Sequence, residues 1–448
     1  MKRIPVIAIF DIGKTNKKIL LFDEIYQLIY NESKHVEETK DEDNFPCEDI
    51  HALTHFIEAT FTSLLKDERY EIKAVNFTAY GASFVLLEES LNIMLPLYNY
   101  LKPFPEKLRE RFYNTYSGES NFSKTTASPV LGNLNSGMQL YRLKYEKAET
   151  FAKIKYALHL PQYLSFILTG QLYSEITSIG CHTNLWDFQK NTYHDWVKKE
   201  DIENILAPII RSDKMADFIK ENIPAGIGLH DSSAALIPYL ISFSEPFILI
   251  STGTWCITLN PFNYQPLTDG ELKKDCLCYL SYEGKPVKAS RLFAGNQHKT
   301  EVKKLSEHFG KPLDYYKNVH FDAEIIKRTF PLKIELMRDL NLFASYEEAY
   351  HQLMMDIITK QVNSTNLVLK GTNCKRMFVD GGFSNNIVYM NLLSKAFPGM
   401  EVYAATVPQA SALGAALVMH QHWNTKALPT DLTKLKYYPT KKETTISK

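Results

Sequence analysis

Cysteine is scarce in this sequence, with six residues among 448, and their spacing matches neither a disulfide framework nor a zinc site. Cys276 and Cys278 are separated by a single residue, and no second pair complements them. The thirteen histidines show no metal-ligand spacing either. We therefore expect reduced thiols, which are typical of a cytoplasmic protein, and no metal site made of cysteine and histidine.

Long apolar runs and an excess of one charge are also absent. No segment approaches the roughly 20 apolar residues that a membrane span requires, and the apolar run at residues 4–10 is too short for a signal peptide. Lys and Arg together number 51, as do Asp and Glu, so the formal net charge is zero. Broad binding to nucleic acid or to anionic membranes needs a basic surface. These absences predict a cytoplasmic protein without nucleic-acid or membrane partners.

The composition that remains is that of an ordinary globular protein, with 45% hydrophobic and 23% charged residues. Strand and helix patterns alternate along the chain, which favours an α/β fold. An apolar strand, a polar turn with one glycine and a second strand open each half of the sequence, and this layout predicts a β-hairpin in each. The three pieces lie at 6–10, 11–16 and 18–23, and again at 247–250, 251–254 and 255–259. We therefore predict two domains of related build, 1–240 and 241–448.

Other periodicities predict the remaining elements. Helical spacing is clearest in the apolar stripe from Tyr350 to Val362 and in a long segment at 135–168, where Pro161 would cause a break. The basic, polar end at 434–448 is expected to fray. Strands are predicted at 74–78, 84–87, 377–379 and 400–404, and further helices at 386–397 and 411–422.

The two hairpin turns carry the first chemical signal. Gly, Ser and Thr let backbone N–H groups approach an anion closely, and the hydroxyl groups add donors. Two such turns, one in each domain, could hold one polyphosphate from opposite sides. Asp11 ends the first strand, where its carboxylate could hold Mg²⁺ directly or through water. Taken singly, each turn is more often a plain solvated hairpin.

Two further motifs end in helices. At 226–235, glycines precede Asp231, which is placed to cap a helix that has Ser232 and Ser233 in its first turn. The same carboxylate is a candidate general base toward a hydroxyl group in a cleft between the domains, and the two roles are compatible. In the second motif, Gly381 and Gly382 separate a strand from a helix and leave room for a flat ligand or a phosphate beside the backbone.

In this order and at these separations, the motifs resemble those of the FGGY carbohydrate kinases, in the actin-like ATPase superfamily. The resemblance covers nearly the whole chain. It implies an α/β fold of two actin-like ATPase (ribonuclease H-like) domains around a central cleft, the first binding sugar and the second binding nucleotide. The matching segments are 11–16, 161–170, 228–235, 251–255, 380–384 and 409–416.

The resemblance also implies a reaction and its residues. The protein would be a transferase that uses ATP and Mg²⁺ to phosphorylate a ketose or deoxyketose resembling L-rhamnulose or L-fuculose. Asp231 would be the general base and Asp11 the carboxylate associated with Mg²⁺. The residues implied to contact ATP are Asp11, Gly13, Lys14, Thr15, Asn16, Ser251, Thr252, Gly253, Thr254, Gly381, Gly382, Ser384 and Asn385. Those implied to contact sugar are Tyr80, Gly81, Ser83, Asn135, Gln139, His230 and Asp231.

The pair His230–Asp231 and the spacing of Asn135 and Gln139 most resemble the rhamnulokinase branch, yet other positions depart from the family. Tyr80 and Ser83 stand where ketose kinases often have Trp and Asp, and residues 98–102 replace a run that usually bears Arg or Asp. The identity of the sugar and the hydroxyl group that is phosphorylated therefore stay open.

Lys14 replaces a small hydroxyl residue of the first turn, and either contacts phosphate or is solvated. Two alternative functions also stay open. One is a kinase of another polyol or ketose, in the xylulose, ribulose or glycerol class. The other is a non-catalytic regulator that binds ATP or sugar, against which the retained Asp231 and phosphate-turn glycines argue. The resemblance leaves a homodimer open as the assembly.

Overall fold

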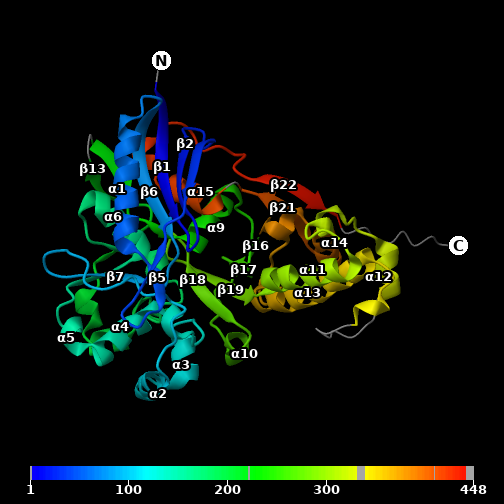
Figure 1. Ribbon diagram of the computed structural model, residues 1–448, viewed down its shortest axis with the longest axis horizontal. Helices are drawn as coiled ribbons and strands as arrows, with labels where there is room; N and C mark the ends of the chain where they lie inside the picture. Colours follow the sequence, from blue (N-terminus) through cyan, green and yellow to red (C-terminus); the bar gives the residue numbers. More distant parts are fainter. Residues whose placement is uncertain (1–2, 220–221, 330–338, 408, 440–448) are drawn as a thin grey trace.

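Two seven-stranded sheets organise the computed structural model, which describes residues 3–219, 222–329, 339–407 and 409–439 (Figure 1). The first sheet has the order β13-β14-β6-β1-β2-β3, with β15 also paired to β6. Its strands are β1 (Ile4–Ile12), β2 (Lys17–Asp23), β3 (Leu28–Lys34), β6 (Tyr70–Ala79), β13 (Met215–Ile219), β14 (Ile223–Gly226) and β15 (Leu229–His230). Both predicted hairpins are present, and the first is β1–β2.

The second sheet has the order β18-β19-β17-β16-β20-β21-β22, and its hairpin β16–β17 occupies the place that β1–β2 has in the first. In each sheet the first hairpin strand also pairs in parallel with a later strand, β1 with β6 and β16 with β20. The strands are β16 (Phe247–Thr252), β17 (Cys256–Asn260), β18 (Cys276–Leu280), β19 (Pro286–Leu292), β20 (Arg376–Gly381), β21 (Glu401–Thr406) and β22 (Lys434–Tyr438). The two halves therefore share one core topology.

Helices cover both faces of each sheet, which is why the central strands are continuous apolar runs. Successive side chains of β1 point to opposite faces: Val6, Ala8 and Phe10 pack in the core with α1 and α6, while Ile7 and Ile9 pack in the core with α9 and α15. The helices of this half are α1 (Ile50–Lys66), α2 (Glu106–Thr115), α3 (Gly118–Thr125), α4 (Ser136–Glu146), α5 (Ala148–Phe151), α6 (Leu160–Thr169), α7 (Ile176–Ile179), α8 (Asp195–Lys199) and α9 (Asp231–Ser242).

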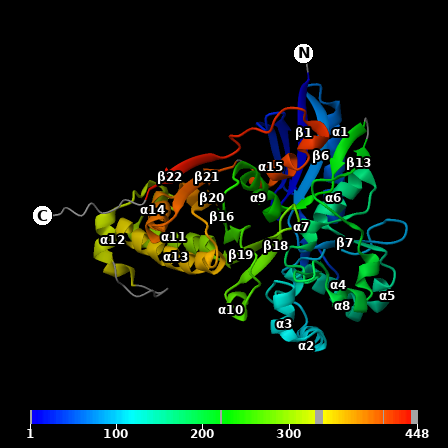
Figure 2. The same cartoon turned by 180° about the vertical axis from the view of Figure 1, so that it is seen from behind.

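On the second sheet, Ile248 and Ile250 pack in a separate core with α11, α13 and α14. Figure 2 shows these helices gathered on the opposite side of the molecule from α2, α3, α4, α5 and α8. The helices of this half are α10 (Asp269–Leu272), α11 (Ala294–Phe309), α12 (Ala323–Thr329), α13 (Tyr346–Leu369), α14 (Ile387–Ala396), α15 (Ala410–Leu417) and α16 (His420–Trp423).

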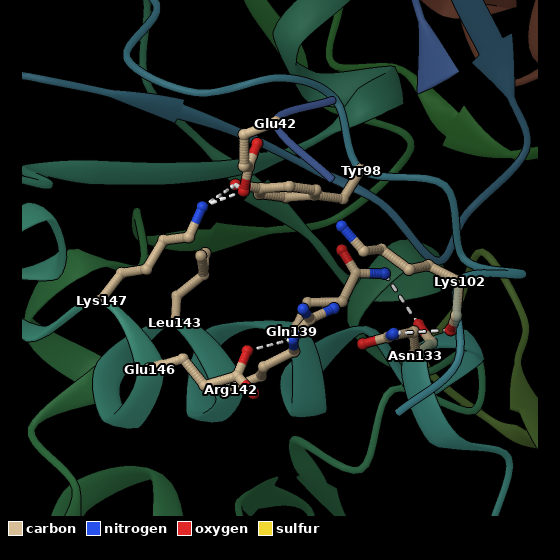
Figure 3. A pocket seen from close by; sticks show the side chains of 9 residues that line it. All are labelled: Glu42, Tyr98, Lys102, Asn133, Gln139, Arg142, Leu143, Glu146 and Lys147. Carbon is tan, nitrogen blue, oxygen red and sulfur yellow. Dashed lines mark hydrogen bonds and ion pairs between the residues drawn. The ribbon is translucent and has the colours of Figure 1, made fainter. Parts of the chain in front are cut away.

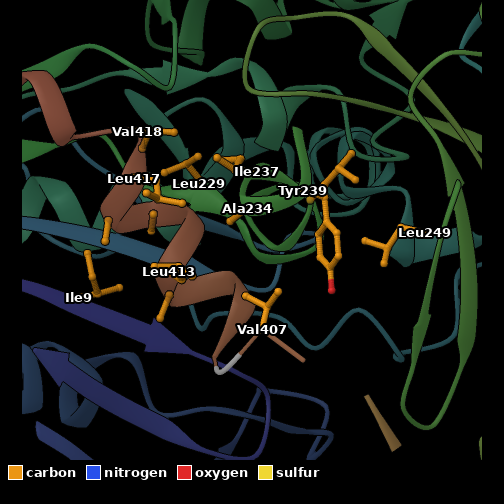
Figure 4. Close-up of a cluster of buried hydrophobic side chains, with 14 of the residues drawn as sticks. Ile9, Leu229, Ala234, Ile237, Tyr239, Leu249, Val407, Leu413, Leu417 and Val418 are labelled. Carbon is orange, nitrogen blue, oxygen red and sulfur yellow. The ribbon is translucent and has the colours of Figure 1, made fainter. Parts of the chain in front are cut away.

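A shared core joins the two sheets, and α9 and α15 lie within it (Figure 4). The two helices approach closely because Gly414 carries no side chain: a Cβ there would lie 1.9 Å from the Ala234 carbonyl oxygen. Although α15 comes late in the chain, it packs on β1 and β6 of the first sheet. The sheets change over between β15 and β16, and the domain boundary near residue 240 stays a prediction.

Three sequence predictions need correction, and the first concerns residues 135–168. They do not form one helix, because α4 and α5 are followed by the strand β8 (Tyr156–His159), which pairs with β7 (Phe84–Leu87). Pro161 is not a break in a helix but lies in the first turn of α6, where a backbone N–H is not needed. Pairing with a distant strand here outweighs the local helical periodicity.

The other two corrections concern the C-terminal part. Residues 434–438 do not fray, since they form β22 against β21 and bury Tyr438 in the core; residues 440–448 lie outside the described residues. The helix predicted at 411–422 is divided into α15 and α16. The remaining strands are short: β4 (Glu38–Lys40), β5 (Pro46–Glu48), β9 (Ser174–Glu175), β10 (Trp186–Asp187), β11 (Thr192–Tyr193) and β12 (Ile209–Ile210).

All six cysteines are buried, and none of them forms a disulfide. Among the helices that the structure describes, none combines the length and the apolar character needed to cross a membrane.

Candidate active site

The candidate site forms where three parallel strands of the first sheet end together. Thr78 on β6 is flanked by Asp11 on β1 and by Leu229 on β15, and the chain continues from β15 into Asp231. Ligand sites in open α/β sheets lie beyond the carboxyl ends of the strands. The topology therefore brings together two carboxylates that are 220 positions apart in the sequence.

Asp231 does not cap its helix as predicted. The cap position is His230, and Asp231 is already the first helical residue, so its carboxylate turns back to accept the Ser232 N–H at 2.6 Å. Ser233 donates to the Leu280 carbonyl oxygen at 3.1 Å, which ties the first turn of α9 to β18 of the second sheet. Asp231 thus lies between the two sheets.

Both carboxylates are unusually basic. Burial raises the pKa of Asp231 to about 6, although hydrogen bonds from Ser232 act in the opposite direction. The pKa of Asp11 also rises to about 6, first because of burial and then because of the charge on Asp231, while Lys18 and Ser411 lower it. Ser411 of α15 donates to Asp11 at 3.2 Å. The two carboxyl groups influence each other, so their titration belongs to the pair.

The first turn, residues 13–16, joins β1 to β2. The Gly13 N–H closes this turn on the Asn16 carbonyl oxygen at 2.9 Å, so its own amide is engaged. Thr15 and Asn16 are exposed at the tip. Lys14, for which the sequence left two roles open, forms an ion pair with Glu38 at 2.5 Å. A phosphate contact would require its ammonium group to leave that partner.

The second turn, residues 252–255, repeats this closure, since the Gly253 N–H donates to the Trp255 carbonyl oxygen at 2.8 Å. The Thr252 hydroxyl is also occupied, because it donates to the Asp380 carbonyl oxygen at 2.5 Å and accepts the Phe383 N–H at 2.9 Å. Ser251 is half-buried, whereas Gly253 and Thr254 are exposed. Of the four residues predicted here, Gly253 and Thr254 are the ones available to a ligand.

The glycine pair after β20 lies against this turn. Gly381 has a φ of +84°, and a Cβ there would lie 1.9 Å from the Thr252 carbonyl oxygen, so the position requires glycine. Ser384 is buried, and its hydroxyl donates to the Gly381 carbonyl oxygen at 2.8 Å. The sequence prediction that Ser384 contacts nucleotide is therefore less direct than for Gly382 and Asn385.

A cavity of about 540 Å³ opens beside the second turn, which is within the range of sites for small molecules and cofactors. Gly253, Gly382 and Asn385, three of the residues for which a contact with ATP is predicted, line it. Its other wall was not found from the sequence, because single residues of α11 and of the 3₁₀ helix Tyr315–Asn318, with the residue that follows it, carry no motif. These residues are Gly295, His298, Tyr316, Lys317 and Val319.

His230 lies beneath Asp231 and is buried. Its Nε2 is 3.1 Å from the Cys181 sulfur and 3.3 Å from the Asp231 carboxylate. Burial lowers the pKa of His230 to about 4, so the ring is neutral at pH 7. Its other ring nitrogen, Nδ1, is buried without a hydrogen-bond partner in the described part of the chain. Cys181 was not predicted from the sequence, since a lone cysteine gives no signal.

Gly81 packs directly on this histidine, because a Cβ at Gly81 would lie 2.8 Å from the His230 ring. The neighbouring Tyr80 is buried and donates its hydroxyl to Glu48 at 3.2 Å. Ser83 donates to the Tyr98 carbonyl oxygen at 2.9 Å. Gly81 and His230 are thus brought together as expected, whereas the polar groups of Tyr80 and Ser83 bond within the protein.

Asn135 and Gln139 also turn inward. Asn135 donates to the carbonyl oxygen of His182 at 2.7 Å and accepts the Leu131 N–H at 2.7 Å. Gln139 donates to the carbonyl oxygen of Ala82 at 2.6 Å. It also donates to that of Asn133 at 2.7 Å (Figure 3). Figure 3 shows Gln139 at a cavity of about 20 Å³, room for roughly one water molecule. In this arrangement the Gln139 amide holds the loop that follows Gly81, and the Asn135 amide holds the segments at Leu131 and His182.

The comparisons agree with this geometry. Residues 6–237 match the model of the FGGY family of carbohydrate kinases, N-terminal domain. A rhamnulokinase of Oceanobacillus iheyensis is 26% identical over 231 residues, which cover 48% of this chain and 47% of the relative. A rhamnulokinase of Bacteroides thetaiotaomicron is 25% identical over 223 residues, covering 47% of this chain and 44% of the relative. The chain thus spans about half the length of the curated relatives it matches.

Solved structures resemble the chain over almost its full length. A carbohydrate kinase from Novosphingobium aromaticivorans has a TM-score of 0.81 and 20% identity, covering 98% of this chain and 95% of that one. A xylulose kinase from Lactobacillus acidophilus has a TM-score of 0.80 and 16% identity, covering 98% and 94%. These likenesses establish the predicted α/β fold of two actin-like, ribonuclease H-like domains.

Proposed function

The chain belongs to the FGGY family of carbohydrate kinases, and we propose that it transfers the γ-phosphoryl group of ATP to a hydroxyl group of a ketose or deoxyketose. One observation carries this proposal: Asp11 and Asp231 lie together at the carboxyl ends of the strands, and each has a pKa of about 6. A general base works best when its pKa is near the operating pH.

Asp231 is the proposed base. A sugar hydroxyl attacks the γ-phosphorus, its proton passes to the Asp231 carboxylate, and the bond from that phosphorus to the ADP oxygen breaks. Phosphoryl transfer requires mainly positioning and charge neutralisation. The Ser232 N–H donates to Oδ1 of the carboxylate at 2.6 Å, and the neutral ring of His230 lies 3.3 Å from the same oxygen.

The residues present fit a magnesium nucleotide. The 540 Å³ cavity beside Gly253 and Gly382 would hold the nucleoside. The exposed residues of the two turns would approach the phosphates, namely Thr15, Asn16, Gly253 and Thr254. Within the described residues, no group of three or more His, Cys, Asp or Glu could hold a metal. Asp11 would thus share Mg²⁺ with phosphate oxygens and water, as is usual for this ion. Bound there, Mg²⁺ would neutralise phosphate charge.

The sugar would lie against His230 and Gly81. Nδ1 of His230 is buried without a partner within the described residues, so a sugar hydroxyl group would reach it only if the side chains around it moved. The similar curated proteins are named rhamnulokinases, which favours an L-rhamnulose-like deoxyketose; L-fuculose is a close alternative.

A second candidate is a kinase of another polyol or ketose, in the xylulose, ribulose or glycerol class. Ser83 donates its hydroxyl to the Tyr98 carbonyl oxygen, so this position lacks the carboxylate that ketose kinases often have there and does not favour this candidate over the first. A non-catalytic regulator is a third candidate, and the retained Asp11 and Asp231 argue against it.

The test is an ADP-release assay with L-rhamnulose, L-fuculose, D-xylulose, L-ribulose, D-ribulose and glycerol, and with the Asp231→Asn variant as the background. Activity above that background with a ketose would support the proposal, and ³¹P NMR of the product would identify the phosphorylated hydroxyl group. Activity with glycerol alone would favour the second candidate. If the parent never exceeds the Asp231→Asn background, the protein is not a kinase of these compounds. A homodimer, a cytoplasmic location and the lack of nucleic-acid or membrane partners remain predictions.

A further inference from the structure

A buried ion pair lies directly beneath the first turn. The Lys17 ammonium is 2.6 Å from the Glu48 carboxylate, and the two side chains are 1% and 2% exposed. Lys17 also donates to the carbonyl oxygens of Gly13 at 3.0 Å and Lys14 at 3.1 Å. The three protons of the ammonium group thus have three acceptors, two of which are backbone atoms of the turn.

The other oxygen of Glu48 faces the sugar side of the site. It accepts the hydroxyl group of Tyr80 at 3.2 Å, and Tyr80 immediately precedes Gly81, which packs on His230. One buried carboxylate therefore touches both the lysine that holds the phosphate turn and the tyrosine that begins the turn against His230. Two direct contacts, Lys17 with Glu48 and Glu48 with Tyr80, thus connect the first turn to the turn at Gly81.

Glu48 is the last residue of the β4–β5 hairpin, which is anchored at its other end as well. Lys102 forms ion pairs with Asp41 at 2.5 Å and Asp43 at 2.6 Å. Asn99 donates to the Pro46 carbonyl oxygen at 2.9 Å. Segment 98–102 replaces a family stretch that usually faces sugar, and here it is fastened to the same hairpin as the phosphate turn. Ion pairs thus connect the β4–β5 hairpin to the first turn through Glu48 and to segment 98–102 through Asp41 and Asp43.

Stability alone does not account for a buried ion pair at this place. Desolvating two charges costs about as much as their attraction returns, and well-packed apolar residues often replace such pairs without loss. A lysine with three fixed acceptors does, however, set the position of the two carbonyl groups it binds. The first turn, which would meet phosphate, is thereby held in one conformation. A shift of Tyr80 would also change its contact with the same Glu48 carboxylate.

We propose that Glu48 is a positioning residue, which holds the first turn ready for nucleotide and links its conformation to the sugar side through Tyr80. The identity of the two ligands rests on the function proposed above. A sugar that presses on Gly81 and His230 would then tighten nucleotide binding, and a nucleotide would tighten sugar binding by the same factor.

The test uses the double variant Lys17→Met with Glu48→Leu, the single variant Glu48→Gln, and Glu71→Gln as a matched control. Glu71→Gln removes the charge from an exposed pair with Lys73, whose atoms are also 2.6 Å apart. Titration calorimetry with MgADP measures the nucleotide site without needing turnover. We expect the double variant to melt near the parent temperature and yet to bind MgADP at least about tenfold more weakly, with the control unchanged.

Tyr80→Phe removes only the hydroxyl group and tests the link to the sugar side. The factor by which the best sugar tightens MgADP, roughly 5- to 150-fold at coupled sites, is expected to fall but to stay above one, because any closure of the site still couples the two ligands. If Glu48→Gln does not fold, the double variant still tests the positioning role and Tyr80→Phe still tests the link to the sugar side. Parent-like MgADP affinity in the folded double variant would overturn the positioning role, and full coupling in Tyr80→Phe would overturn the link.

The outcomes also separate this inference from the proposed function. A parent that binds MgADP but phosphorylates no sugar would sink the kinase assignment, while the Glu48 role would still stand or fall on the MgADP titrations. A parent that binds no MgADP would overturn the inference, since there would be no nucleotide for the first turn to receive.

Discussion

The two turns that face the candidate site have the same local form and are held by different forces. Each closes on its own glycine N–H, Gly13 in one case and Gly253 in the other. A buried ion pair of Lys17 and Glu48 lies beneath the first turn, and a half-exposed ion pair of Lys14 and Glu38 lies beside it. The first turn is thus held mainly by ion pairs between charged side chains.

The second turn is held by close backbone contact. A Cβ at Gly295 would lie 1.8 Å from the Gly253 carbonyl oxygen, and one at Gly381 would lie 1.9 Å from the Thr252 carbonyl oxygen. The Thr252 hydroxyl adds a bond to Asp380. This turn should therefore be sensitive to any added atom near it, whereas the first should be sensitive to loss of charge. Related topology does not imply the same source of rigidity.

Both turns would deliver phosphate to one base, so the largest effect should come from removing that base. We expect Asp231→Asn to lower kcat by roughly 10²–10⁴, the usual value of a positioned general base. Folding and nucleotide binding should be retained, because the amide oxygen can still accept the Ser232 N–H. The measurement is steady-state kinetics with the best sugar of the panel.

The Asp231→Asn variant also shows whether the turns act independently of the base. MgADP affinity close to the parent value would mean that they do. A kcat near the parent value would show that Asp231 only supports the start of α9. Another group would then have to accept the proton of the sugar hydroxyl.

The second prediction would break the second turn and leave the first intact. Gly381→Ala places a Cβ against the Thr252 carbonyl oxygen at a positive φ, and Gly382→Ala meets nothing within 4 Å. Steric crowding and the unfavourable backbone conformation should together cost Gly381→Ala about 2–5 kcal/mol of stability. Thermal unfolding should show a lower Tm for Gly381→Ala and a parent-like Tm for Gly382→Ala. Equal Tm values for the two variants would mean that the second turn accommodates an added Cβ without loss of stability.

These predictions also show what the sequence could provide. Both hairpins, the glycine positions and the order of the motifs are local patterns, so the two turns were predictable, while the role of Asp231 as base stays a prediction. Gly81 and His230 lie against each other, and their contact with sugar stays a prediction. The α/β fold followed from the same motifs through their resemblance to a family.

Contacts between distant residues could not be predicted. Glu48 at the end of β5 pairs with Lys17 on β2, and the far wall of the cavity beside the second turn includes His298 and Tyr316, which carry no motif. The strand β8 escaped prediction for a related reason, since its pairing with β7 is a tertiary contact that outweighs a helical pattern. Asn135 and Gln139 were noticed from their spacing, but their bonds to nearby carbonyl groups become visible only in three dimensions.

The third prediction uses pH to distinguish the two sides of the site. The first turn follows Asp11, which has a pKa of about 6 and shares its titration with Asp231. Because Asp231 must be ionised to accept a proton, kcat/KM should rise with pH through about 6 and level off above about 7. Below the transition it should fall by about tenfold per pH unit if one group controls the rate, and more steeply if both must ionise. A profile that is flat from pH 5 to 8 would contradict the role of the pair.

The last prediction requires both turns at once. Asp231 lies between the sheets, and Ser233 ties its helix to β18, so a sugar held near His230 and Asp231 should favour the arrangement in which both turns reach the phosphates. A ligand shifts such an equilibrium only through its different affinities for the two states. Sugar and nucleotide should therefore bind with a positive coupling of about 1–3 kcal/mol. Calorimetry of a non-hydrolysable ATP analogue with and without sugar would measure the coupling, and small-angle scattering should show a more compact particle with both ligands. If the affinity for nucleotide does not change with sugar and the particle does not contract, the turns act on a static site. Their different rigidity would then concern stability and not closure.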